Sequence, residues 1–123
     1  MQFMMMFNER PEDIATGRGD GPDSETYWAG WNAFIGAMFA AGVAKYGDGL
    51  QPPETATTLR IVDGKRVVHD GPFADTKEML GGYLVIDAPD LDTALDWAAK
   101  APCAHGGSVE IRPVLPPMNP PST

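Results

Sequence analysis

Two stretches of the chain are apolar on both faces of an extended strand. Residues 2–7 read QFMMMF, so phenylalanine and methionine occupy both faces there. Residues 83–87 repeat the pattern with Leu84, Val85 and Ile86. A strand that is covered on one side only alternates apolar with polar residues. Both stretches therefore predict central strands that are buried on both sides.

Two other segments carry apolar residues at helical spacing. The first helix is expected to begin near Asp23 or Ser24, either of which can cap it, and to end at Gly42. Its apolar stripe, which predicts packing against a sheet, comprises Trp28, Trp31, Phe34, Ile35, Met38 and Phe39. The second helix is expected to be capped by Asp90 and to end before Pro102.

A β-hairpin is the clearest local prediction. Residues 57–62 and 65–69 are rich in β-branched side chains and flank Asp63-Gly64, a strong signal for a two-residue turn. This turn fixes the register, so that Thr57 faces Asp70 at the open end of the hairpin.

Four further segments complete the chain. Short strands are predicted at residues 43–50 and 108–114, the second at an edge or half-exposed. Residues 8–23 are rich in glycine, proline and acidic residues and are predicted to form a long acidic surface loop. Residues 116–123 are predicted to form a proline-rich, extended tail, which leaves residues 1–115 as an expected single domain.

The order of these elements predicts the fold class. Strand, helix, strand, hairpin, strand, helix and strand together give a ferredoxin-like α+β fold, an antiparallel sheet with two helices on one face. Two helices can cover only one face, while the central strands are apolar toward both. We therefore expect a second subunit to cover the other face, which makes the protein a homodimer.

Composition excludes several classes of partner. The chain holds nine basic and 17 acidic residues, has a net charge of −8, and contains no basic run. This acidity argues against direct binding to nucleic acid or to anionic membranes. No apolar stretch approaches the roughly 20 residues of a membrane span, and Met1–Phe7 lacks the charged region of a signal peptide. With a single cysteine, Cys103, the sequence predicts a cytoplasmic protein.

The segment 69–83 has the features of a pocket rim. It contains a Gly-Pro turn, an exposed aromatic residue and Gly81-Gly82, which predicts a bulge or a close backbone approach. The candidate ligand-binding residues are Asp70, Gly71, Pro72, Phe73, Glu78 and Gly82. A tight connection between strands needs the same residue types, so this structural interpretation stays open.

Asp70 is the candidate catalytic residue. Burial beside Phe73 could raise its pKa into a range useful for acid–base chemistry, although a turn-stabilising role explains it equally well. His69 points to the opposite face of the strand, and His105 is expected to be solvated. The sequence has no metal-ligand spacing, P-loop or dinucleotide motif, so we expect no metal and no cofactor.

The same segment resembles a known family signature. Asp70-Gly71-Pro72-Phe73, Thr76-Lys77-Glu78 and Leu80-Gly81-Gly82-Tyr83 are similar to the DGPF-domain family, a branch of the YCII-related proteins. Matching blocks at residues 49–53 and 106–114 extend the resemblance. It implies a dimeric α+β barrel, in which two sheets face each other with a cleft between or beside them.

The resemblance also limits what can be transferred. Several YCII relatives have a histidine near the start of the first helix that is thought to work with an aspartate. Here that helix carries Tyr27, Trp28 and Trp31 and no histidine, so this mechanism does not carry over. Members of the DGPF branch are often encoded beside extracytoplasmic-function sigma factors, which implies a regulatory partner by resemblance only.

Three functions follow as hypotheses. The first is a homodimeric protein that binds a small organic ligand in a cleft lined by the signature segment. The second is a cofactor-free enzyme of lyase, isomerase or oxygenase type, acting on a small aromatic or carbonyl compound with Asp70 as base. The third is an accessory partner of a sigma factor.

Overall fold

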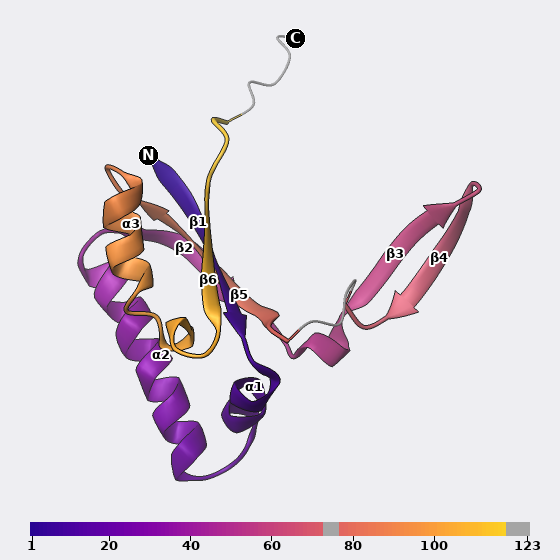
Figure 1. The fold of residues 1–123 in the computed structure, drawn as a ribbon, viewed down its shortest axis with the longest axis horizontal. Helices are drawn as coiled ribbons and strands as arrows, with labels where there is room; N and C mark the ends of the chain where they lie inside the picture. The colour runs from indigo at the N-terminus through magenta and orange to yellow at the C-terminus, as the bar shows by residue number, and fades with distance from the viewer. Residues whose placement is uncertain (73–76, 118–123) are drawn as a thin grey trace.

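The body of the protein is a four-stranded antiparallel sheet in the order β2-β5-β1-β6. The computed structural model describes residues 1–72 and 77–117. The strands are β1 (Gln2–Glu9), β2 (Ala44–Gly49), β5 (Met79–Asp87) and β6 (Ser108–Pro113), and the two main helices are α2 (Pro22–Ala40) and α3 (Leu91–Ala98). Both helices lie on one face of the sheet (Figure 1). This arrangement confirms the predicted ferredoxin-like α+β fold.

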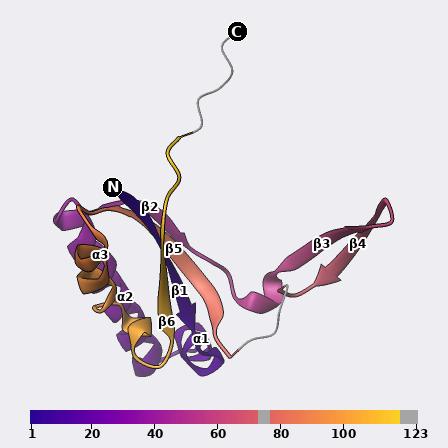
Figure 2. The same cartoon turned by 45° about the horizontal axis from the view of Figure 1, so that its top comes forward.

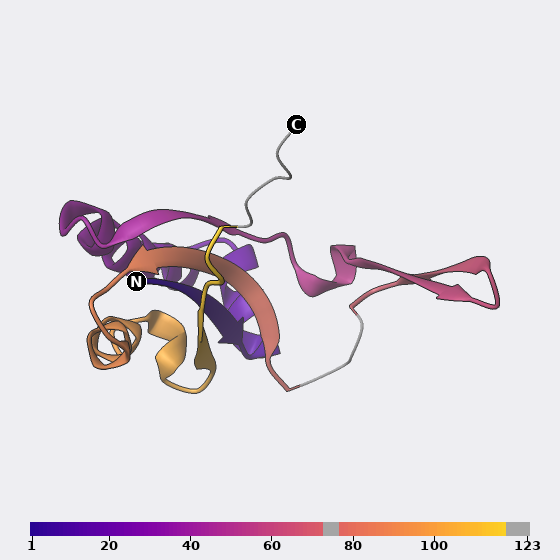
Figure 3. The ribbon, with the colours of Figure 1, turned by 90° about the horizontal axis from the view of Figure 1, so that it is seen from above.

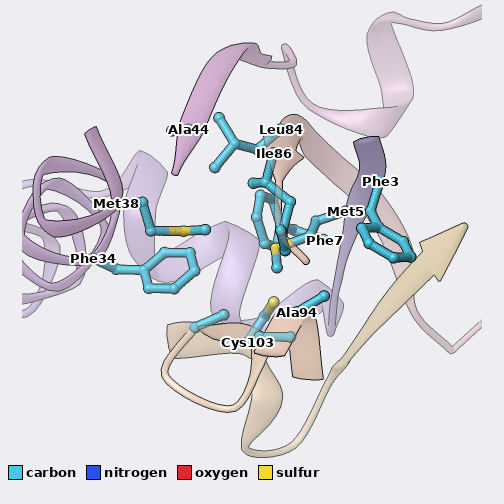
Figure 4. Packing of buried hydrophobic residues seen from close by; sticks show 13 residues of the cluster. Phe3, Met5, Phe7, Phe34, Met38, Ala44, Leu84, Ile86, Ala94 and Cys103 are labelled. Atoms are coloured by element: carbon cyan, nitrogen blue, oxygen red, sulfur yellow. The ribbon is translucent and has the colours of Figure 1, made fainter. Parts of the chain in front are cut away.

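A single core fills the space between the sheet and the two helices. The inward residues of β1 and β5 meet α2 and α3 there, as Figure 4 shows for Phe3, Met5, Phe7, Phe34, Met38, Leu84, Ile86 and Ala94. Met5, Met38 and Ile86 expose no surface. Each such side chain contributes about 1.5–3 kcal/mol through burial, so this core holds the sheet and the helices together.

The opposite face of the sheet has no helix over it. We call it the open face and define it by Met4, Met6 and Val85. Met4 and Met6 are half-buried, while Val85 is 1% exposed between its neighbours. The central strands are therefore apolar toward both faces, but within one chain only the helix side is fully covered.

Strands β3 (Thr57–Val62) and β4 (Lys65–Asp70) form a separate two-stranded sheet that projects away from the body (Figures 2 and 3). We call residues 57–70 the arm. Its register runs from Val62 opposite Lys65 to Thr57 opposite Asp70, which confirms the predicted hairpin. Every residue of β4 is exposed.

The predicted loop at residues 8–23 is wrong. Residues Pro11–Arg18 form helix α1, which begins with proline and has Glu12 and Asp13 in its first turn. Proline at the first helical position and acidic residues beside the positive end of the dipole both favour a helix start. This helix has no apolar stripe, so the hydrophobic pattern gave no sign of it.

The N-terminal ends of the two longer helices differ in whether the predicted residue caps them. Helix α2 begins at Pro22 after Gly21, and the expected cap Ser24 instead donates a hydrogen bond to the Gly17 carbonyl at 3.1 Å. Asp90 caps α3 as predicted, because its carboxylate accepts a hydrogen bond from the Thr93 N–H at 2.8 Å.

No helix in the described part of the chain is long and apolar enough to span a membrane.

Candidate ligand-binding cleft

A cleft of about 790 Å³ lies between α2 and the end of the sheet formed by β1, β2 and β5. Helix α1 and residues 50–55 complete its rim. Its walls are rich in aromatic rings, which come from Phe7, Tyr27, Trp28, Trp31, Phe39 and Tyr83. Pockets for small organic ligands usually occupy about 300–1,000 Å³ and are mostly apolar with a few polar groups. The size and composition of the cleft match that class.

Glycine residues keep the sheet side of the cleft free of side chains. Gly47, Gly49, Gly81 and Gly82 all line it. Phe7 pairs with Gly82 and Asn8 pairs with Leu80, so Gly81 is the additional residue of a bulge. A Cβ atom on Gly82 would lie 3.0 Å from the Asp48 carbonyl oxygen. These observations confirm the predicted bulge and close approach at Gly81-Gly82.

Glu9 brings a carboxyl group to the inner end of this cleft. It ends β1 on the same face as Phe7 and is 7% exposed, the one charged residue that is buried within residues 1–72 and 77–117. The Tyr27 hydroxyl donates a hydrogen bond to Oε1. Oε2 lies against Gly81, where a Cβ atom would collide with it. The carboxyl group is thus bound by Tyr27 of α2 on one side and lies against the backbone of Gly81 on the other.

The surroundings of Glu9 raise the pKa of its carboxyl group above the ordinary value. Burial raises the pKa of Glu9, and the carboxylate of Asp13 raises it further, while the Tyr27 hydroxyl and the Trp31 indole act in the opposite direction. Burial and the neighbouring carboxylate also raise the pKa of Tyr27. No basic side chain in the described part of the chain forms an ion pair with Glu9. Arg10 instead binds Asp13, at 2.9 Å between Nε and Oδ2.

Contacts between α1 and α2 fix the position of Tyr27. Its ring packs so closely on Gly17 that a Cβ atom there would lie 2.5 Å from Cε1 of the ring. The Trp28 indole N–H donates a hydrogen bond to the Gly17 carbonyl oxygen at 2.7 Å. The indole nitrogen of Trp31 is buried and has no partner of good hydrogen-bond geometry in the described part of the chain. Helix α1 therefore orients the wall of the cleft.

The outer part of the cleft carries two further polar pairs. The Tyr83 hydroxyl donates a hydrogen bond to Asp48 Oδ2 at 2.8 Å, and this contact raises the pKa of Tyr83. Arg18, the one basic residue among the described residues of the lining, forms an ion pair with Glu54. Within residues 1–72 and 77–117, the lining therefore offers two carboxyl groups, Glu9 and Asp48, and one arginine that is already paired.

The structure brings one of the predicted ligand-binding residues, Gly82, into the cleft. Glu78 lies elsewhere and accepts a hydrogen bond from the Ser108 hydroxyl of β6. Pro72 lines a smaller depression of about 320 Å³ together with Pro53 and Met79. Phe73 lies outside the described residues.

Asp70 and Gly71 lie at the base of the arm, outside the lining of the cleft. Asp70 is exposed and pairs with Thr57 across the hairpin. Gly71 has a φ of 101°, and its N–H donates to the Ala56 carbonyl oxygen at 2.7 Å. The turn conformation expected of Gly71 is thus confirmed, whereas a role for Asp70 in binding or catalysis stays a prediction. His69 and His105 are both exposed.

Sequence reasoning missed Glu9, which the structure makes the most distinctive polar group of the cleft. A signal was available, because strand alternation places residue 9 on the same face as Phe3, Met5 and Phe7. A lone acidic residue on a core face requires an explanation. Sequence reasoning ended the strand at Phe7 and assigned Glu9 to a loop.

In the part of the chain that the structure describes, the cleft has neither a metal centre nor a reactive thiol beside it. Within residues 1–72 and 77–117, no three side chains of the metal-binding types lie close enough to hold an ion. Burial, together with the nearby Glu9 carboxylate, raises the pKa of the Cys103 thiol to about 12. A thiol with that pKa stays protonated and unreactive at neutral pH.

The fold and the cleft define a ferredoxin-like α+β protein with a pocket of ligand size. The chain belongs to the YCII-related domain family, which it matches over residues 1–118. A protein of Rhizobium meliloti described as uncharacterised is 48% identical over 67 residues. These residues are 53% of this chain and 54% of the relative, so the chain spans about half the length of the curated relative that it matches.

One solved structure with a similar fold is 5-chloro-2-hydroxyhydroquinone dehydrochlorinase (TftG) from Burkholderia phenoliruptrix, in complex with 2,5-dihydroxybenzoquinone. The two chains superpose with a TM-score of 0.54, cover 94% of each other and share 16% of their residues. At that level of identity the likeness establishes the fold alone.

Proposed function

We propose that this protein binds a small organic molecule in the cleft between α2 and the sheet, and that it does so as a cytoplasmic homodimer. The observation that carries the proposal is the cleft of about 790 Å³, whose aromatic walls surround the buried carboxyl group of Glu9. Aromatic walls with few polar groups suit a planar apolar ligand. The similarly folded TftG was solved with a small ring compound, 2,5-dihydroxybenzoquinone, which supports this class of ligand.

Filling the cleft tests the proposal. Gly49 lines the cleft, and a Cβ atom there would meet no other atom within 4 Å. We expect Gly49→Leu to leave thermal stability nearly unchanged and to lower the affinity for small aromatic compounds at least tenfold. The measurement is isothermal titration calorimetry, with a thermal melt of each variant.

A matched control separates filling of the cleft from a general effect of leucine. Gly36 lies on α2, outside the cleft lining, and also has open space around its Cβ position. Gly36→Leu is expected to bind the same compounds with the affinity of the wild type. Equal binding by Gly49→Leu and wild type would remove the cleft as the binding site.

Two apolar surfaces that a single chain leaves partly exposed support the homodimer. The open face leaves Met4 and Met6 half-buried, and the arm is a two-stranded sheet, a unit that is only marginally stable in water on its own. The arm nevertheless exposes five large apolar side chains, each with 45–63% of its surface accessible: Leu59, Ile61, Val62, Val67 and Val68. Contact with a second copy would cover both surfaces.

Charge complementarity also supports contact between copies. The arm holds three of the nine basic residues, namely Arg60, Lys65 and Arg66, and only two of the 17 acidic ones. The rest of the chain carries six basic and 15 acidic residues. A slightly positive, apolar arm is therefore suited to bind the strongly acidic body of a second copy.

A second candidate function is a cofactor-free enzyme of lyase, isomerase or oxygenase type. The observation that favours it is the raised pKa of the Glu9 carboxyl group, which lies in the cleft and is hydrogen-bonded to Tyr27. Carboxyl groups with raised pKa values in clefts often act as general acids or bases. TftG, which has a similar fold, is itself a dehydrochlorinase. Association with a sigma factor stays a prediction from the sequence.

Two carboxyl variants test the enzyme hypothesis. If a substrate screen finds turnover, we expect Glu9→Gln to abolish it and the sequence-derived candidate, Asp70→Asn, to retain it. We expect this difference because Glu9 lines the cleft, whereas Asp70 lies outside that lining. Loss of turnover in Asp70→Asn alone, with an unchanged melting temperature, would reverse this assignment.

A further inference from the structure

Glu9 occupies its position at a cost to the stability of the protein. It is 7% exposed, has no ion-pair partner among the described residues, and has Asp13 as a further negative group nearby. A buried carboxyl group without a cation is one of the costliest groups that a folded chain can hold. Residues that break a local stability rule in this way are concentrated at functional sites.

The carboxyl group also has unused capacity to accept hydrogen bonds. An ionised carboxylate offers about four acceptor positions. The contact of good geometry here is the Tyr27 hydroxyl on Oε1, while Oε2 lies over the bare backbone of Gly81. Both Glu9 and Gly81 line the cleft, so a molecule in the cleft has access to this acceptor.

The surroundings restrict what such a molecule can be. Phe7, Tyr27 and Trp31 form flat apolar walls around the carboxyl group. Among the described residues, the lining holds two carboxyl groups, and its one arginine, Arg18, is already paired with Glu54. A ligand with a negative charge would be repelled at short range. The cleft therefore favours an aromatic ligand without negative charge.

We propose that Glu9 is the ligand-selecting group of the cleft, and that it accepts a hydrogen bond from an O–H or N–H donor on a planar aromatic ligand that carries no negative charge. This inference rests on the proposed function, because it assumes that the cleft is a binding site. It adds the class of ligand and the residue that selects it.

The first test compares stability with pH. Glu9 has a raised pKa in the folded state, so it imposes no penalty when protonated below about pH 4, near its unfolded pKa. The penalty appears as the pH rises through the interval between the unfolded and folded pKa values. Glu9→Gln is thus expected to melt roughly 3 °C or more above the wild type at pH 8, and at the same temperature as the wild type at pH 4.

The titratable groups that face Glu9 do not reverse the expected direction of this pH dependence. Asp13 of α1 is paired with Arg10, at 2.9 Å between Nε and Oδ2, and this pair is present in both the wild type and Glu9→Gln. Tyr27 of α2 has a raised pKa, and that of Cys103 is about 12, so both stay neutral. Glu12→Gln, which changes an exposed carboxyl group on α1, is the control and is expected to change the melting temperature little at either pH.

The second test uses three probe compounds of similar shape: a naphthalenediol, its dimethyl ether and the corresponding hydroxynaphthoate. The ether lacks donors and the naphthoate carries a negative charge. A site built to bind a donor strongly rejects analogues that lack it. By calorimetry at pH 8, we expect the diol to bind the wild type at least tenfold more tightly than either analogue.

Variants then connect this preference to Glu9. Glu9→Gln is expected to lower the affinity for the diol at least tenfold and to leave the affinity for the ether unchanged. Gly81→Ala tests the same contact in a second way, because the added Cβ atom displaces Oε2 of Glu9 while the charge of Glu9 remains. This variant should also reduce binding of the diol. Glu12→Gln should bind all three compounds as the wild type does.

The outcomes distinguish the inference from the proposed function. Equal binding of diol and ether, with no effect of Glu9→Gln, would overturn the role of Glu9 and leave the cleft as a binding site. A drop in the melting temperature of Glu9→Gln at pH 8 would likewise overturn it, by making Glu9 a structural residue. Failure of all three probes to bind the wild type would count against the cleft itself.

Discussion

Phe7→Ala is expected to lower the free energy of unfolding by about 3–5 kcal/mol. Phe7 is 4% exposed and belongs to the core between the sheet and α2. Its ring makes edge-on contacts with Trp31 and Phe34, with centroid distances of 5.1 and 5.8 Å. Alanine would remove both contacts and leave a void in the core next to the cleft. Urea denaturation followed by tryptophan fluorescence measures the loss.

Phe39→Ala is the matched control for this prediction. Phe39 lies on α2 and lines the same cleft, but 49% of its surface is exposed. Its truncation leaves no closed cavity, so the expected loss is below about 1.5 kcal/mol. A similar loss in both variants would mean that the exposed wall of the cleft supports the fold as much as the buried core does.

The sequence predicted the parts of the fold that local chemistry determines. Asp63-Gly64 fixed the hairpin and its register because both residues adopt positive φ angles, 51° and 75°. The cap at Asp90 and the bulge at Gly81 follow equally from local rules. The order of strands and helices then left the ferredoxin-like sheet as the natural arrangement.

Helix α1 was missed because tertiary contacts stabilise it. It has eight residues and no apolar stripe, and an isolated helix of that length is unstable in water. What holds it is the packing of the Tyr27 ring on Gly17 and the bond from Trp28 to the Gly17 carbonyl oxygen. Contacts between segments ten residues apart leave no periodic signal in the sequence.

The aromatic wall that α2 contributes to the cleft was missed for a related reason. The apolar stripe of α2 predicted a wholly buried helix face, but the sheet covers only part of it. Phe34 and Met38 are buried, whereas Trp28 and Phe39 are half exposed beside the cleft. Periodicity shows which side chains share a face and does not show how far the opposing sheet extends. The apolar stripe of α2 is wider than the part of the helix that the sheet covers. Its remaining aromatic residues therefore form a wall of the cleft.

Lysine substitutions on the arm are expected to convert the proposed homodimer into a monomer. Leu59 and Val68 face each other across the hairpin, and about half or more of each side chain is exposed in the single chain. Leu59→Lys with Val68→Lys therefore costs the monomer little, but it places two charges in any interface that the arm forms. Burying unpaired charges of this kind weakens association by roughly a hundredfold or more.

Sedimentation velocity at micromolar concentration measures this effect. The wild type should sediment as a dimer whose interface exceeds the roughly 1,000 Å² of a specific contact. Because the arm is basic and the body acidic, added salt should weaken the dimer. The matched control is Leu91→Lys with Leu95→Lys, since these leucines of α3 are 50% and 48% exposed but lie outside the arm. It should remain dimeric, and a wild type that sediments as a monomer would refute the dimer.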